Sequence, residues 1–169
     1  MRKIKLQAGL TLVEILTAIL VIGVGLVGVA SLSLANVRTT ISGYIQSQAT
    51  ILGDELADTM RANLAAYESA DFSSTPASTT KYCLTGTICN ANEQARYDIQ
   101  KWLENIGATL PGGVAAICMD STPDDGQPGS LACDGAGMNT VKIFWLDSRN
   151  QELLAEGETF QRHVLTITP

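Results

Sequence analysis

The sequence lacks the features of several large functional classes. Beyond residue 38 it has no run of basic residues, and its formal net charge is -6, so nothing predicts a surface that neutralises nucleic-acid phosphates. The motifs G-x-S-x-G and H-E-x-x-H and the phosphate loop are absent, and the single histidine, His163, falls in an expected strand. We therefore expect neither an enzyme nor a direct nucleic-acid partner, and we expect no cofactor.

Charged side chains are also missing from residues 15–37. A helix of these residues would extend about 34 Å, close to the thickness of the hydrocarbon core of a bilayer. The basic residues Arg2, Lys3 and Lys5 precede the apolar run, and such residues stay on the cytoplasmic side of a membrane. The sequence therefore predicts a single membrane-spanning segment, with residues 38–169 as a soluble head outside the cytoplasm.

The four cysteines form two pairs that are local in the sequence, Cys83 with Cys89 and Cys118 with Cys133. An even number of cysteines suits an oxidising compartment. Three pairings are open to four cysteines, and we favour the two local bridges because they need no long-range coincidence. A zinc site is a weaker alternative, since the spacings C-x5-C and C-x14-C lack a close C-x2-4-C pair and the histidine is remote.

Three interpretations compete for the N-terminus. A secretory signal would end in the small-residue pattern at residues 33–35, but its apolar region would normally be only about 7 to 15 residues long. A permanent anchor fits the length but leaves Glu14 unexplained, because an acidic residue within a membrane helix costs about 2.5 to 3.5 kcal/mol. In the third interpretation a short basic leader is cut away, so that Glu14 lies close to a new terminus.

The segment "QAGLTLVEIL" resembles the class III leader of type IV pilins and pseudopilins. In that family a short basic leader ends in glycine, and the apolar helix that follows has glutamate as its fifth residue. Here these positions are Gly9 and Glu14. The resemblance implies that a prepilin peptidase removes residues 1–9 before Leu10. It also implies N-methylation of Leu10, where the family usually has phenylalanine, and a membrane-spanning and assembly segment over residues 10–37.

Two roles are compatible for Glu14. With Thr11 it has the T-x-x-E spacing of a capping box at a helix start. The resemblance implies a second role, in which the Glu14 carboxylate meets the N-terminal amine of a neighbouring subunit. A buried charge is tolerable only when it is paired, so the assembly contact is the role we favour.

The helix is expected to continue past the membrane, from about Thr11 to Ala66. Apolar residues recur there at spacings of three and four: Ile41, Ile45, Leu52, Leu56 and Met60. A second helix is expected from a cap at Asn90 or Asn92 to Gly107, with Trp102 in the core. The segment "LPGG" at residues 110–113 predicts a turn.

Strands are expected at residues 114–119, 140–146 and 161–168. In the second of these, Val141, Ile143 and Trp145 alternate with Lys142 and Phe144, as one face of a sheet against a long helix requires. Short sequential strands with turn-rich links favour antiparallel pairing. The sequence therefore predicts the α+β class, with a long N-terminal helix packed on a small antiparallel sheet.

Four carboxylates lie close together in residues 120–137: Asp120, Asp124, Asp125 and Asp134. Such a cluster suits calcium, but the loop fails the EF-hand pattern because Thr122 takes the third position and Asp125 the sixth. We expect a solvated acidic turn and no metal site.

The head also resembles one group of type IV pilus proteins, the PilV-type minor pilins, or type IV pilus modification proteins. The resemblance lies in "SQATILGDELADTMRANLAAY" at residues 47–67, and in "QKWLENIGATLPGG" followed by "VKIFWLD". It implies a pilin fold, an inner-membrane protein with a periplasmic head, and incorporation into the pilus after processing.

The same resemblance implies a function. The protein would help other minor pilins to prime pilus assembly at or near the tip, with a tip adhesin as a further partner, and so support twitching motility and adhesion. Two alternatives stay open: a minor pseudopilin of type II secretion, and a periplasmic binding or sensor module on an uncleaved anchor.

Overall fold

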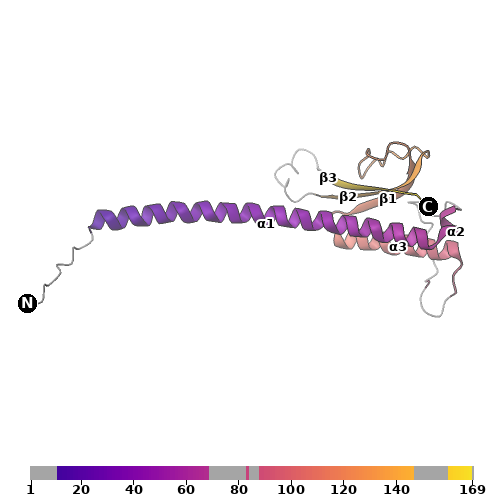
Figure 1. Cartoon of the computed structure of the whole chain (residues 1–169), viewed down its shortest axis with the longest axis horizontal. Coiled ribbons are helices and arrows are strands. Elements are labelled where there is room, and N and C mark those ends of the chain that lie inside the picture. Colours follow the sequence, from indigo (N-terminus) through magenta and orange to yellow (C-terminus); the bar gives the residue numbers. More distant parts are fainter. Residues whose placement is uncertain (1–10, 69–82, 84–87, 147–159, 169) are drawn as a thin grey trace, which may run out of the picture. The chain divides into compact units, whose positions relative to one another are not determined.

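The computed structural model describes residues 11–68, 83, 88–146 and 160–168. The described part contains, in order, α1 (Leu12–Ala62), α2 (Leu64–Glu68), α3 (Ala91–Thr109), β1 (Val114–Asp120), β2 (Met138–Leu146) and β3 (Phe160–Ile167) (Figure 1). The chain divides into two compact units, residues 1–40 and 41–169. The predicted α+β class, with a long N-terminal helix and a small antiparallel sheet, is confirmed.

Helix α1 has two parts with different surroundings. Its 51 residues would extend about 76 Å at the usual helical rise. Up to residue 40 its side chains are exposed, whereas from Ile45 onward seven of its residues are buried. The buried positions recur every three or four residues, as expected for one helix face against a core.

The first helix ends earlier than predicted, at Ala62 rather than Ala66. Asn63 interrupts it, and its side-chain amide donates a hydrogen bond to the Ala91 carbonyl oxygen at 2.8 Å. The Asn63 carbonyl then accepts hydrogen bonds from Ala66 and Tyr67 at the start of α2. The side-chain bond of Asn63 thus ties the end of α1 to the start of α3.

Helix α3 begins with a complete capping box, and Asn90 is its cap. The Asn90 side chain accepts from the Glu93 backbone N–H at 2.8 Å, and the Glu93 carboxylate accepts from the Asn90 backbone N–H at 3.0 Å. The helix passes through Gly107, where we expected it to stop, and ends at Thr109. Pro111 accounts for the later end, because proline cannot continue the backbone hydrogen bonding and disfavours helical geometry at the preceding residue.

The sheet has the order β1-β2-β3, and both strand pairs are antiparallel. The predicted turn at residues 110–113 leads into β1 and is joined to the end of β2, where the Leu146 N–H donates to the Pro111 carbonyl at 2.8 Å. Gly112 has a φ of +58°, and a Cβ there would lie 2.8 Å from Leu146 Cδ1. This position therefore requires glycine both for its backbone and for the close approach of Leu146.

The core lies between the second part of α1, helix α3 and one face of the sheet. It contains Leu52 and Leu56 from α1, Trp102 from α3, and Val141 and Ile143 from β2. Trp102 is only 5% exposed, and its indole N–H donates to the Leu52 carbonyl at 2.7 Å. The predicted core role of Trp102 is confirmed, and α3 runs alongside the second part of α1 in Figure 1.

Candidate functional site

The start of α1 carries the first candidate site. The Glu14 backbone N–H donates to the Thr11 side-chain oxygen at 3.3 Å, which is one of the two hydrogen bonds of the predicted capping box. The Glu14 carboxylate is exposed and has no partner among the described residues. The predicted cleavage and methylation positions, Gly9 and Leu10, lie outside the described residues.

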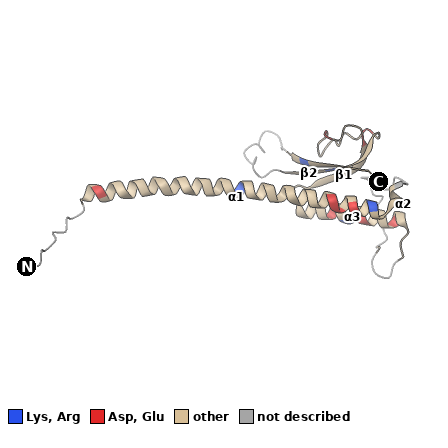
Figure 2. Ribbon diagram, in the orientation of Figure 1, with Lys and Arg blue, Asp and Glu red and all other residues tan. Residues whose placement is uncertain are grey.

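The residues that follow Glu14 form an apolar helical surface. Leu12, Val24 and Leu34 are 74%, 69% and 65% exposed, and other large apolar residues between them are similar. Figure 2 shows an uncharged stretch of α1 between an acidic position near its start and a basic position further along. In length and composition α1 can cross a membrane, a property that signal sequences and core helices of soluble proteins share.

Both disulfides join cysteines that are local in the sequence, Cys83 with Cys89 and Cys118 with Cys133. This is the pairing that the sequence analysis favoured. Cys89 directly precedes the cap of α3, and Cys118 lies on β1. The second bridge therefore attaches the segment around Cys133 to the sheet.

The face of the sheet that points away from the core is also covered. Pairing of Ala116 with Lys142 and of Asp120 with Met138 places Cys118, Asp120 and Lys142 on one face. Lys142 and Asp120 have fully buried side chains. Side chains of β2 alternate between the two faces of the sheet as predicted. Those on the second face, away from the helices, are buried as well.

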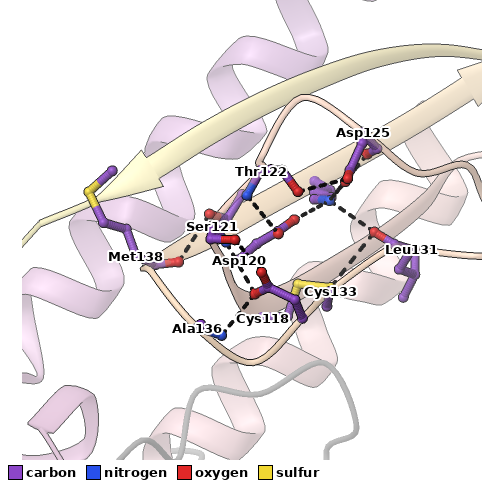
Figure 3. Close-up of a disulfide and its surroundings, with 12 residues drawn as sticks. Cys118, Asp120, Ser121, Thr122, Asp125, Leu131, Cys133, Ala136 and Met138 are labelled. Atoms are coloured by element: carbon purple, nitrogen blue, oxygen red, sulfur yellow. Dashed lines mark hydrogen bonds and ion pairs between the residues drawn. A yellow bond between two sulfur atoms is a disulfide. The ribbon is translucent and has the colours of Figure 1, made fainter.

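The Lys142 ammonium binds four oxygen atoms. It forms an ion pair with Asp120 Oδ2 and a second one, at 2.8 Å, with Asp125 Oδ1. It also donates to the carbonyl oxygens of Asp125 at 3.1 Å and Leu131 at 2.9 Å. Figure 3 shows Asp120, Asp125 and Leu131 gathered around one point, and the contacts above place the Lys142 ammonium there. A single side chain of the sheet thus holds two separate points of the loop over residues 121–137.

The two carboxylates at Lys142 are themselves held by Thr122. Its backbone N–H donates to Asp120 Oδ1 at 3.0 Å, and its hydroxyl donates to Asp125 Oδ2 at 2.8 Å. The fourth carboxylate, Asp134, binds the loop backbone and accepts from Ala136 N–H at 2.8 Å and from the Ser121 hydroxyl. The expected solvated turn is wrong for Asp120, because it is buried against a cation; Asp124, whose side chain is 95% exposed, fits that expectation.

The charged groups of this cluster shift one another's pKa values. Burial lowers the pKa of Lys142, but its hydrogen bonds and ion pairs with Asp120 and Asp125 outweigh this effect, so the net pKa is raised. The hydrogen bond from Lys142, and then that from Thr122, lowers the pKa of Asp125. The Ser121 hydroxyl lowers the pKa of Asp134 in the same way. The cluster is therefore an ion-paired one at neutral pH.

A metal-ligand geometry also occurs here. Potential ligand atoms of Cys118, Asp120 and Cys133 lie within 4.8 Å of one another. Both sulfur atoms are used in the disulfide, so they are not available as thiolates, which are the form that binds metals. The Asp120 carboxylate is already paired with Lys142.

A groove of about 350 Å³ lies between α1 and α3, away from the sheet. Its walls include Glu55 and Thr59 from α1 and Asp98 and Asn105 from α3. Partial burial raises the pKa of Asp98, against the effect of a 2.7 Å hydrogen bond from Gln94. The groove thus holds a carboxylate that is partly desolvated.

Sequence reasoning missed the buried ion pairs of Lys142. The signal was present, since a lysine inside "TVKIFWL" has apolar neighbours on both sides, but alternation alone does not tell whether a loop covers the second face. Comparison of the chain with protein-family models, curated proteins and solved structures gives no match. Functional assignment therefore depends on the residues and contacts above.

Proposed function

We propose that the chain is a minor pilin of the type IV pilus, made with a leader that a prepilin peptidase removes after Gly9. The observation that carries the proposal is the division of one helix into two surfaces. α1 is exposed up to residue 40, has no charged side chain over residues 15–37, and supplies core residues to an α+β head from Ile45 onward. An exposed apolar helix of this length needs a bilayer or other helices around it.

Glu14 supports an assembly role within this surface. Among the described residues its backbone N–H takes part in capping and its carboxylate has no partner, so the carboxylate remains available to another subunit. An unpaired carboxylate in lipid costs about 2.5 to 3.5 kcal/mol. Removal of residues 1–9 would create a positively charged amine at Leu10, and the amine of a staggered neighbour would offset that cost.

The proposal includes a location and a pathway. The processed chain is held in the inner membrane by one span with its head in the periplasm, where disulfides are stable. It then enters the pilus with other minor pilins, at or near the tip. There it helps to prime assembly and so supports twitching motility and adhesion.

The test is incorporation into pili of a Glu14→Leu variant. We expect the variant to remain in the membrane fraction, because leucine favours insertion, while its amount in sheared pili falls at least about tenfold, which corresponds to 1.4 kcal/mol. Glu55→Leu, an exposed carboxylate further along the same helix, is the matched control and should incorporate normally.

Two results would count against the proposal. Equal incorporation of Glu14→Leu and wild type would remove the pairing role of Glu14. Absence of the wild-type protein from sheared pili, with presence in a secretion complex, would favour the minor pseudopilin of type II secretion instead.

A further inference from the structure

The Lys142 cluster brings a buried amine and a buried carboxyl group together. Lys142 and Asp120 have side chains that are 0% exposed and are in direct contact, and Asp125, whose side chain is 45% exposed, lies beside the same nitrogen. We propose that Lys142 Nζ and the Asp120 carboxyl group condense to an intramolecular amide bond, with Asp125 as the proton carrier. This inference concerns the head alone and is independent of the proposed function.

The Asp120 carboxyl group has a backbone donor at one oxygen and the amine at the other. Its Oδ1 accepts the Thr122 backbone N–H at 3.0 Å, while its Oδ2 faces Lys142 Nζ. Attack of Nζ on Cγ of Asp120 would place negative charge on Oδ1. The Thr122 N–H is therefore already placed where a donor stabilises a tetrahedral intermediate.

Asp125 is oriented for proton transfer. Its Oδ2 accepts the Thr122 hydroxyl at 2.8 Å, which turns its Oδ1 to Lys142 Nζ, also at 2.8 Å. A general acid or base must lie within hydrogen-bond reach of the proton that it moves, and Asp125 meets this condition for the protons of Nζ.

The reaction balances without any further reagent. The ammonium of Lys142 carries three protons, and the Asp120 carboxylate carries one negative charge. Asp125 takes a proton from Nζ and passes it to Oδ2, so that a free amine faces a neutral carboxyl group, and the amine then attacks Cγ. A second proton of Nζ follows, Oδ2 leaves as water, and the amide keeps the third proton. Asp125 ends as it began, and two buried charges become one neutral amide.

The raised pKa of Lys142 means that the reaction begins from the ion pair, so attack is slow. A slow reaction is sufficient because each molecule forms the amide only once. The fixed contact between the reacting groups provides the large effective concentration of an intramolecular reaction. The disulfide from Cys118 to Cys133 and the hydrogen bond from Lys142 to Leu131 keep the loop in place meanwhile. Burial of the charges disfavours the ions relative to an amide.

Trypsin gives a direct readout in the full-length protein. After denaturation, reduction and alkylation, cleavage at a free Lys142 separates residues 102–142 from residues 143–149. An amide at Lys142 blocks this cleavage. We expect an uncleaved peptide of residues 102–149 whose mass is lower by one water. Complete cleavage at Lys142 with no loss of water would overturn the proposal.

Two variants separate the amide from other dehydrations. Lys142→Arg keeps the positive charge and the trypsin site but cannot form this amide, so it should be cleaved and show no loss of water. Loss of water that persists in Lys142→Arg would indicate dehydration at an aspartate-glycine bond, such as Asp125–Gly126, and would contradict the proposal.

Asp125→Asn tests the proton carrier. It keeps the pair of Lys142 and Asp120, and we expect the uncleaved fraction formed in a given time after synthesis to fall at least about tenfold. Circular dichroism equal to that of the wild type would show that the head is folded. An unchanged rate of amide formation in the folded variant would exclude Asp125 as the proton carrier.

Discussion

At the scale of single residues, Gly53 is a position where α1 lies against the sheet. A Cβ at this position would lie 3.3 Å from Cδ2 of His163 on β3 and 3.7 Å from Cδ1 of Ile143 on β2. Gly43, on the same helix, has no such neighbour within 4 Å. The two glycines thus have the same helical backbone but different space around them.

This contrast predicts different effects of the same substitution. Gly43→Ala should raise the free energy of unfolding by about 0.5 to 1 kcal/mol, because alanine is the better helix former. Gly53→Ala has the same gain in propensity but forces His163 to shift, so it should be clearly less stable than Gly43→Ala. Denaturant unfolding in mild detergent measures both, and equal gains would show that α1 is not pressed against β3 at Gly53.

Asp98 gives a pH-dependent prediction. Partial burial raises its pKa above the ordinary value of 3.8, so the fold prefers the protonated form and its charge costs stability at neutral pH. The stability that the protonated form of Asp98 contributes is fully present below pH 3.8 and is lost as the pH rises through the raised pKa. Asp98→Asn should therefore be more stable than the wild type at pH 7 by about a few tenths of a kcal/mol, since the group is partly exposed to solvent.

The measurement is unfolding of both proteins from pH 3 to pH 7. The advantage of Asp98→Asn should shrink as the pH falls toward the ordinary value of 3.8. A difference that stays constant over this range, or one that grows on acidification, would contradict the assigned direction of the Asp98 shift.

At the scale of elements, the residue at which a helix begins or ends depends on which side chain binds its unpaired backbone N–H and C=O groups. The sequence left Asn90 and Asn92 as alternative caps for α3, and the structure uses Asn90 because only there does Glu93 stand at the third helical position and complete the capping box. Gly107 was a wrong end for the helix, since Pro111 and the extended Leu110 stop it instead. Local spacing therefore predicts that a helix exists better than it predicts its last turn.

The two asparagines offer a matched pair of variants. Asn90→Ala removes the side-chain acceptor for the Glu93 N–H and should lower the free energy of unfolding by about 1 kcal/mol. Asn92→Ala changes an exposed residue in the first turn of α3 and should have little effect or a slightly stabilising one. Thermal unfolding in detergent compares them; equal losses would mean that the Asn90 cap is not what holds the start of α3.

At the scale of the whole molecule, the class and the order of elements follow from sequence periodicity. Apolar residues at spacings of three and four predict the helices, and alternating apolar residues predict β2. Proline and glycine at residues 110–113 predict the turn before β1. The cover over the second face could not be predicted, because it depends on a lysine reaching a loop held by the bridge from Cys118 to Cys133. Sequence periodicity predicts which face of a strand packs against a core. It does not predict a single long-range contact, such as that of Lys142 with the loop, because one residue produces no repeating pattern.

The apolar first part of α1 raises a different question from that of the head. Its surface depends on an environment outside the chain, and the meaning of Glu14 depends on where the mature chain begins. With residues 1–9 attached, Glu14 follows a segment that contains Arg2, Lys3 and Lys5. In the proposed function these residues are removed, so that Glu14 lies near a terminal amine and serves as an assembly contact.

The N-terminal residue of the protein recovered from its organism tests the proposed function most directly. Mass spectrometry of the N-terminal peptide from purified membranes and pili gives this residue and any methyl group on it. The account predicts Leu10 as the first residue in both fractions. An intact Met1 would contradict it in favour of an uncleaved anchor, and a chain that begins at Asn36 would contradict it in favour of a secreted domain.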